Sequence, residues 1–323
     1  MFRTTLTPHR SHYPITLNHR LLTAGSCFAD AIGNKLIAYK FTCSSNPFGV
    51  IYNPHSIHKA LHYAIHNQMP PDYTFLTNQE IHLNYDFHSA IGALTLPDLK
   101  KKLTDTIGAS HTFLKNTHWL MITYGTSWVY SLKETGAIVA NCHKMPSSLF
   151  QKELFTQKKF LESFELLYKD LIAFNPSIRI ILTVSPVRHL NDSLELNSVS
   201  KAILRIGCHT LSEAFDRVHY FPAFELMMDD LRDYRFYKAD MIHPSDEAQE
   251  YIWQHFSKTF FDQSTQAFIA GWKTVLQALQ HKPFHPASAA HQQFLKESLK
   301  KLESFSTLVN ITSEAEQLKK QLV

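Results

Sequence analysis

The sequence predicts an α/β fold: a three-layer α/β/α sandwich built on a mostly parallel sheet, with further helices at the C-terminal end. Two observations predict it. Short runs that are apolar throughout alternate with stretches of helical periodicity, which is typical of parallel strands covered by helices on both faces. The chain has 323 residues, of which 44% are hydrophobic, enough for a large core in one or two domains.

The first part of the chain is predicted to form a strand, a turn and a helix. The run Leu21–Ala24 is apolar and stops at Gly25, and residues 30–38 then have helical periodicity. A second strand is predicted at residues 41–43. A helix is predicted at residues 56–66, where apolar side chains recur at helical spacing.

The middle and later parts continue this alternation after an interruption. Residues 69–97 are rich in Pro, Asn and Asp, so we expect an irregular insertion or a small hairpin there. Strands are predicted beyond it at residues 119–124, 178–184 and 218–221. Helices are predicted at residues 98–114, 157–174, 199–215 and 246–261, with a short helix opening at Pro222. Residues that follow the strands should converge, because active sites of such sheets lie at the carboxyl ends of strands.

The C-terminal part differs in character, and we divide the chain into a main domain, residues 1–262, and a helical extension, residues 263–323. A helical stripe of apolar residues occurs in this extension, formed by Phe294, Leu295, Leu299, Leu302 and Phe305. We expect this stripe to pack on its own domain, since amphipathic surface helices are common. A homo-oligomer contact through the same helix is the alternative.

Composition argues against several classes of partner. The chain has 32 basic and 28 acidic residues, for a net charge of +4, so we expect no nucleic-acid partner. No apolar run approaches the roughly 18 residues that a membrane-spanning helix needs, so no membrane partner is expected. The four cysteines are widely scattered and the N-terminus lacks the pattern of a secretory signal, which favours reduced thiols and a cytoplasmic location.

Motif spacing also argues against cofactors. The nine glycines are never spaced as in the two common phosphate-binding loops. The twenty histidines suggest metal binding, but H-E-x-x-H and paired C-x-x-C motifs are absent. We therefore predict neither a cofactor nor a metal, although His88 and His143 remain alternative metal ligands. His58, His62 and His66 are expected on a solvated helix face, where their spacing also permits a metal pair.

The most informative local pattern is Asp240–Ser245, a D-x-x-H-P-S motif before a helix. An Asp three residues before a His can orient its imidazole, which leaves the other ring nitrogen free to act as a general base. In the alternative interpretation, Ser245 caps the helix while Asp240 and His243 are merely solvated. The motif alone does not decide between them.

A matching nucleophile is expected at the end of a strand, where a turn and a following helix place backbone amides nearby. The segment Gly25–Ala29, with Ser26 and Cys27, fits this requirement. Its alternative is a turn of small residues with a buried Cys. A thiol at a helix N-terminus near a His would have a lowered pKa and be reactive as thiolate.

These two patterns together resemble a known family. Residues 25–29 spell GSCFA, and the chain resembles the GSCFA-domain family, which is similar to the SGNH (GDSL-type) hydrolases. Agreement extends from about residue 3 to residue 262 and comprises the blocks NPFGVIYNP at Asn46, DFHS at Asp86, GTSWVY at Gly125, VANCHK at Val139, SPVRH at Ser185 and DMIHPS at Asp240.

The resemblance implies site residues. SGNH enzymes place a catalytic Ser in a G-D-S turn after the first strand and end with D-x-x-H. Superposing that turn on Gly25 makes Cys27 the nucleophile, whereas a shift of one residue makes it Ser26. We favour Cys27 on the register of the turn. Adjacent side chains diverge, so only one of the two can face His243.

The oxyanion site departs from that of the SGNH enzymes. The amides of the nucleophile and of Gly49 are the expected donors, but no Asn follows Gly125 where the resemblance implies one. The candidates to replace it are Thr126, Ser127, Asn46 and Asn141. Further polar residues are expected either to border the cleft or to hold its loops, namely Arg188, His189, His143 and His88.

The expected function is that of an SGNH-type acyl-ester hydrolase or O-acyltransferase acting on a small acyl group, possibly on a carbohydrate. Cys27 or Ser26 attacks the carbonyl, His243 carries the proton and Asp240 orients the imidazole. The alternative is a non-catalytic binding or accessory protein on the same fold, because the Asn that the resemblance implies after Gly125 is missing.

Overall fold

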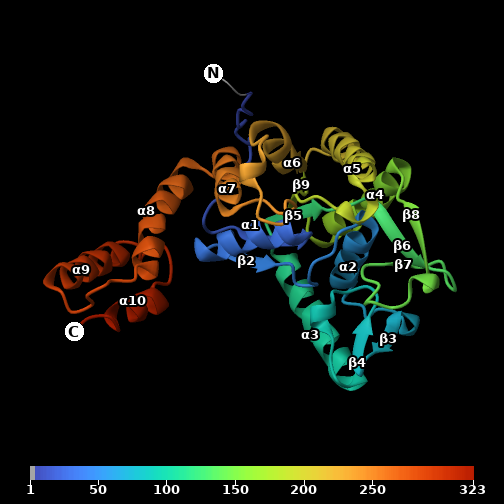
Figure 1. Ribbon diagram of the computed structural model, residues 1–323, viewed down its shortest axis with the longest axis horizontal. Helices are drawn as coiled ribbons and strands as arrows, with labels where there is room; N and C mark the ends of the chain where they lie inside the picture. Colours follow the sequence, from blue (N-terminus) through green and yellow to red (C-terminus); the bar gives the residue numbers. More distant parts are fainter. Residues whose placement is uncertain (1–3) are drawn as a thin grey trace.

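The fold is built around a five-stranded parallel sheet with the strand order β10-β9-β5-β1-β2. The computed structural model describes residues 4–323 (Figure 1). The strands of this sheet are β1 (Arg20–Gly25), β2 (Thr42–Ser45), β5 (Trp119–Tyr124), β9 (Arg179–Val184) and β10 (Val218–Tyr220). The predicted α/β fold with a parallel sheet is therefore confirmed.

Alternate residues of each central strand enter two hydrophobic cores. In β5, Leu120 and Ile122 belong to one core, while Trp119 and Met121 belong to the other. Side chains alternate across a strand, so a strand that is apolar throughout must be covered on both faces. This explains why β1, β5 and β9 are apolar at most of their positions.

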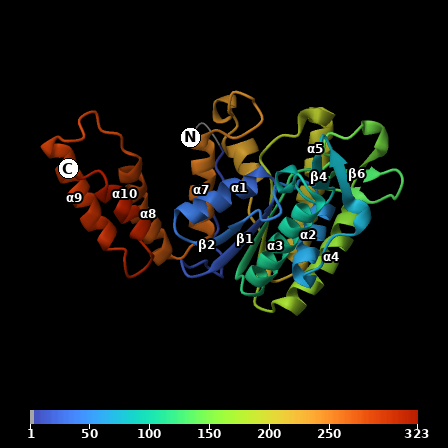
Figure 2. The ribbon, with the colours of Figure 1, turned by 90° about the horizontal axis from the view of Figure 1, so that it is seen from below.

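Helices cover both faces of the sheet (Figure 2). One layer consists of α2, α3, α4 and α5, and the other contains α1, α6 and α7. Their bounds are α1 (Cys27–Ala38), α2 (Pro54–His66), α3 (Leu96–Lys115), α4 (Gln157–Phe174), α5 (Leu194–Ala214), α6 (Ala223–Glu225) and α7 (Asp246–Phe260). A π-helical segment, Leu226–Asp230, follows α6, and short 3-10 turns lie at Asp72–Thr74, Ser89–Ile91, Ser147–Leu149, Leu190–Asp192 and Tyr234–Phe236.

Several helices begin earlier than the apolar periodicity indicates. Helix α1 starts at Cys27 rather than at residue 30, and α5 starts at Leu194 rather than at residue 199. In both, a serine hydroxyl accepts a hydrogen bond from an early helical amide, Ser26 from Phe28 and Ser193 from Leu196. Capping residues of this kind satisfy amides that have no intrahelical partner, and they set the start of a helix independently of its buried face.

Two small antiparallel sheets accompany the central one. The predicted small hairpin in the insertion is confirmed as β3 (Phe75–Asn78) and β4 (Ile81–Asn84). A three-stranded sheet of order β7-β6-β8 was not predicted. Its strands are β6 (Trp128–Leu132), β7 (Ile138–Val139) and β8 (Phe150–Leu154).

The C-terminal helices extend the second core away from the sheet. They are α8 (Gln263–Gln280), α9 (Ala289–Glu303) and α10 (Thr312–Lys319), at the red end of Figure 1. The Trp272 indole donates a hydrogen bond to the Ala38 carbonyl at 3.0 Å, and Lys40 pairs with Glu314 at 2.6 Å.

The predicted apolar stripe of the tail packs largely against its own chain. Leu295 and Leu302 are buried in the second core, and Phe305 contacts the ring of Trp272. Phe294 is 37% exposed. A homo-oligomer through this helix stays a prediction. Within residues 4–323, none of the helices combines the length and the apolarity required to span a bilayer.

Candidate active site

The turn between β1 and α1 is held by close backbone contact with β5. Gly25 has a φ of +131°, and a Cβ at this position would lie 2.1 Å from the Thr123 carbonyl oxygen. The Ser26 amide donates to that same oxygen at 3.0 Å. Glycine is required at position 25 both for its backbone conformation and for the missing Cβ.

Ser26 and Cys27 have different environments. Ser26 is fully buried, and its hydroxyl caps α1 by accepting from the Phe28 amide at 3.3 Å. Cys27 is the first residue of α1 and is partly exposed. Its amide has no intrahelical acceptor. The structure thus places the Cys27 thiol, and not the Ser26 hydroxyl, within reach of solvent.

Asn46 fastens the turn from the end of β2. Its side-chain oxygen accepts from the Gly25 amide at 2.7 Å, and its side-chain nitrogen donates to the Ser26 carbonyl at 3.4 Å. Asn46 is buried and has a φ of 41°. It therefore positions the turn between β1 and α1, rather than offering the free oxyanion donor expected from the sequence.

The electrostatics of Cys27 differ from the expectation of a lowered pKa. Burial raises the pKa of the thiol, and the Asp30 carboxylate raises it further, while the positive charge of Lys201 opposes both effects. The thiol is therefore protonated in the resting protein at neutral pH. A nucleophilic role then needs a group that removes this proton.

Lys201 on α5 is a site residue that the sequence analysis missed. It is 2% exposed, and its ammonium group donates to the carbonyls of Gly125 and Ser185, both at 2.7 Å. These two residues directly follow β5 and β9. Burial lowers the Lys201 pKa to about 7. A signal existed in the sequence, because Lys201 lies on the same helical stripe as the buried Leu204 and Cys208.

The Asp240–His243 motif forms a pair in a solvent-exposed loop. The imidazole Nδ1 lies 2.7 Å from Asp240 Oδ2, while the other carboxylate oxygen accepts from the amides of Ile242 and His243 at 2.9 Å. Hydrogen bonds from these two amides, and from the imidazole, lower the Asp240 pKa to about 2. Both side chains are 44% exposed. Ser245 also caps α7, accepting a hydrogen bond from the Ala248 amide. The motif therefore contains both the predicted Asp–His pair and the helix cap of the alternative interpretation.

Arg188 connects this loop to the end of β9. Its guanidinium lies 4.2 Å from the ring centre of Tyr237 and donates to the Met241 carbonyl at 3.4 Å. Met241 has a φ of 57°. Arg188 therefore supports the loop that carries His243.

His189 lies between the two halves of the site. Its ring makes an edge contact with Tyr52 at 5.1 Å between centroids, and its Nε2 is buried with no hydrogen-bond partner among residues 4–323. Burial, with the charges of Lys201 and His243, lowers the pKa of His189 to about 3. Burial raises the pKa of the Tyr52 phenol, and the charge of Cys27 raises it further. His243 thus acts electrostatically on His189, and Cys27 on Tyr52, while in the described part of the chain no hydrogen bond joins Cys27 to His243.

The other expected oxyanion donors are engaged in structural contacts. The Gly49 amide donates to the Asn46 carbonyl at 2.8 Å, which corrects its predicted role in this conformation. Thr126 and Ser127 are bonded to Ser200 of α5, with the Ser127 amide donating to the Ser200 hydroxyl at 2.7 Å. Neither hydroxyl replaces the missing Asn. The amide of Cys27, which among residues 4–323 has no acceptor, is the donor that remains.

The histidine of the predicted VANCHK block is a structural residue. His143 is buried, and its Nε2 must donate to the Asn84 carbonyl at 2.8 Å because a carbonyl only accepts. Its Nδ1 then accepts from the Ser89 hydroxyl at 2.9 Å. Both nitrogens are occupied, so His143 is no metal ligand here. Asn141 supports it by accepting from the His143 amide at 2.8 Å.

Two other histidines make structural contacts, and one of them departs from expectation. His88 caps a 3-10 turn, accepting from Ala90 at 3.3 Å, and its Cβ would be 2.3 Å from a Cβ on Gly49. His58 is buried rather than solvated, since its nitrogens contact Ser163 and Tyr124, both at 2.7 Å. Burial lowers the pKa of His58 well below the usual range.

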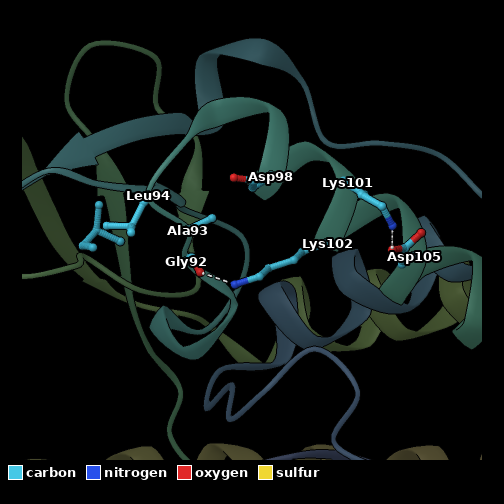
Figure 3. A pocket seen from close by; sticks show the side chains of 8 residues that line it. Gly92, Ala93, Leu94, Asp98, Lys101, Lys102 and Asp105 are labelled. Carbon is cyan, nitrogen blue, oxygen red and sulfur yellow. Dashed lines mark hydrogen bonds and ion pairs between the residues drawn. The ribbon is translucent and has the colours of Figure 1, made fainter.

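A hollow of about 490 Å³ lies over α3 and the insertion (Figure 3). Its charged groups are partnered within the chain: Lys101 pairs with Asp105 at 2.6 Å, and Lys102 donates to the Gly92 carbonyl at 2.9 Å. None of the predicted site residues lines it, and we assign it no chemistry.

The fold and site define an α/β protein with a cysteine at the carboxyl end of its first strand and an aspartate–histidine pair on a late loop. Comparison with family models identifies it further: the chain belongs to the GSCFA family, whose model matches residues 20–256. The model described as the GSCFA domain protein, C-terminal domain, matches residues 272–323.

Other comparisons add little. No curated protein matches the chain. A solved structure described as a proposed platelet activating factor from Streptococcus pneumonia is 10% identical, with 75% of this chain and 84% of that chain covered and a TM-score of 0.39. With so low an identity and TM-score, this likeness says nothing about activity.

Proposed function

We propose that the chain is an acyl-transfer enzyme, an ester hydrolase or O-acyltransferase that acts on a small acyl group such as an acetyl group, possibly carried by a carbohydrate. Cys27 is the nucleophile, His243 the general base and Asp240 the residue that orients it. One observation carries the proposal: a partly exposed thiol follows the carboxyl end of β1, and a hydrogen-bonded aspartate–histidine pair lies on a loop that Arg188 joins to the segment after β9.

The placement of these groups supports the assignment. Arg188 joins the His243 loop to the segment after β9, and His189 beside it is close to Gly125 after β5. Cys27 follows β1. In a parallel sheet these carboxyl ends share one edge, where ligands of doubly wound folds bind.

The reaction proceeds in two steps. The Cys27 sulfur attacks the ester carbonyl while His243 takes the thiol proton. The carbon–oxygen bond to the alcohol then breaks, and His243 returns the proton to the leaving oxygen. Water, or the hydroxyl of an acceptor, releases the acyl group from the thioester. The Cys27 amide and the Lys201 charge stabilise negative charge on the sulfur and the carbonyl oxygen.

A specific observation favours a second candidate, a binding or accessory protein. The thiol has a raised pKa, and the Gly49 amide is already used within its turn. Such a protein would bind esters without turning them over.

The two candidates are separated by activity and labelling. We expect wild type to hydrolyse p-nitrophenyl acetate or release acetate from acetylated glycans, and His243→Ala and Cys27→Ala to lose at least about 100-fold in rate. Iodoacetamide should label Cys27 stoichiometrically, and substrate should block it. Because the thiol must stay reduced, we expect the protein to act in a reducing compartment such as the cytoplasm.

Matched variants make the result specific. His285→Ala removes an exposed histidine and should retain the wild-type rate. Ser26→Ala should retain labelling of Cys27, since Ser26 is a buried cap. Equal rates for wild type and His243→Ala would overturn the enzyme assignment. Labelling without turnover would favour the binding protein.

A further inference from the structure

Three potential metal ligands meet on the outer surface of the helical layer that contains α2 and α4. His62 and His66 lie one turn apart on α2, with nearly parallel rings whose centroids are 6.0 Å apart. Asp170 on α4 brings one carboxylate oxygen to 3.0 Å from His62 Nδ1 and 2.9 Å from His66 Nε2. The three ligand atoms lie within 4.8 Å of one another.

We propose that His62, His66 and Asp170 form a binding site for a divalent transition metal ion, with Zn²⁺ as the best match. The site is separate from the candidate active site and does not depend on the proposed function. The spacing of His62 and His66 permits a metal pair, but without H-E-x-x-H or paired C-x-x-C motifs the sequence predicts no metal. The carboxylate comes from a helix more than one hundred residues away.

Ligand chemistry supports this choice. Two imidazole nitrogens and one carboxylate oxygen form a donor set that zinc commonly takes, with bond lengths of about 2.0–2.2 Å. Ligand atoms around a tetrahedral ion of that size are separated by roughly 3.3 Å. The observed separations of 3.0 and 2.9 Å are close to this value. Small side-chain rotations would suffice to admit the ion.

Charge and access also fit a cation. A carboxylate with two neutral imidazoles carries one negative charge, which attracts a dication. The side chains are 29%, 51% and 37% exposed for His62, His66 and Asp170, so an ion can enter and keep water as a fourth ligand. Burial lowers the His62 pKa, which favours the neutral imidazole that binds metal.

His62 also borders a cavity of about 340 Å³ between α2 and α4. His55 and His58 line the same cavity. An ion held by His62 would lie at the rim of this cavity. Both helices are anchored in the first core, so the ligands come from rigid elements rather than from loops.

Calorimetric titration of the full chain with Zn²⁺, after removal of metals with a chelator, tests the proposal. We expect one equivalent to bind with a dissociation constant in the micromolar range or below. His66→Ala and Asp170→Asn should weaken binding at least tenfold. His209→Ala, which removes an exposed histidine from α5, should bind as wild type does.

Cobalt substitution and thermal melting give independent readouts. Co²⁺ should show the visible bands of a tetrahedral nitrogen–oxygen site, and Zn²⁺ should raise the melting temperature of wild type and His209→Ala but not of His66→Ala. A thiolate-to-cobalt band would place the ion on cysteine and overturn the site. So would equal affinity of wild type and His66→Ala. If His66→Ala melts at a lower temperature than wild type, His66→Gln serves as the second variant, because it keeps a polar side chain of similar size. It should show the same loss of Zn²⁺ binding.

Discussion

The two halves of the candidate site are built in different ways. The turn Gly25–Cys27 is buried and held by residues far away in sequence, since Thr123 and Asn46 bind its backbone. The Asp240–His243 loop is exposed and is held mainly by local bonds, because Asp240 accepts from the amides of Ile242 and His243 and pairs with the His243 imidazole.

Because of this difference, mutations in the turn should mainly change the stability of the fold, and mutations in the loop should mainly change activity. A change in the turn disturbs two strands and the start of α1, so it should affect folding first. A change in the loop alters exposed contacts that contribute little to folding, so it should affect activity first. The following predictions test this contrast.

Gly25→Ala should have the largest effect. The new Cβ would lie 2.1 Å from the Thr123 oxygen at a φ of +131°, which combines backbone strain with overpacking. We expect a loss of about 4 kcal/mol in the free energy of unfolding, measured by urea denaturation. Gly136→Ala is the control, since that glycine has a φ of +71° but no atom within 4 Å of its added Cβ. Its loss should stay near 1 kcal/mol, and equal losses would contradict the steric argument.

Asp240→Asn should lower activity while leaving the stability of the fold almost unchanged. The imidazole loses the carboxylate that orients its Nδ1, so we expect ester hydrolysis to fall about 100-fold. The urea midpoint at neutral pH should hardly move, because both side chains are 44% exposed. The pKa of Asp240, lowered to about 2, makes only a small, solvent-screened contribution to the free energy of unfolding, which is present above the unfolded value near 3.8 and lost as the pH falls towards 2. A large loss of stability at neutral pH would show that the loop supports the fold.

Lys201→Met tests the buried charge beside the turn. The unfolded chain binds a proton at this lysine up to about pH 10.4, whereas the folded chain releases it near pH 7. Between these values the unfolded state binds more protons, so wild-type stability should rise with pH relative to the variant. The slope is at most about 1.4 kcal/mol per pH unit. Urea unfolding at pH 7, 8 and 9 measures it.

Two observations check the Lys201 prediction. Lys300→Met, at an exposed lysine of α9, should give a curve parallel to wild type, and parallel curves for Lys201→Met would refute the buried charge. The variant should also alkylate more slowly with iodoacetamide below pH 7, where Lys201 is charged, because this charge opposes the raised pKa of Cys27.

The fold could be predicted from the sequence because its signals are local. Largely apolar runs predicted most of the five parallel strands, and the GSCFA and D-x-x-H motifs located the turn and the Asp–His pair. Long-range partners left no comparable signal. The Gly49 amide donates to the Asn46 carbonyl and the Ser127 hydroxyl to the Ser200 carbonyl, so neither group is the free oxyanion donor expected from the resemblance to SGNH enzymes. Strands β6, β7 and β8 pair only with each other, and their short mixed runs resemble loops.

Arg188→Met should have the smallest effect and shows how far the loop depends on its support. The variant keeps much of the side-chain bulk but loses the stacking on Tyr237, 4.2 Å away, and the bond to the Met241 carbonyl. An exposed cation–π contact is worth about 0.5–1 kcal/mol, so kcat for ester hydrolysis should fall about two- to fivefold with an unchanged urea midpoint. Arg235→Met is the control, because Arg235 pairs with Asp233 on the surface at 2.8 Å. A 100-fold loss in Arg188→Met alone would mean that Arg188 contacts the substrate, and that the loop is not held mainly by local bonds.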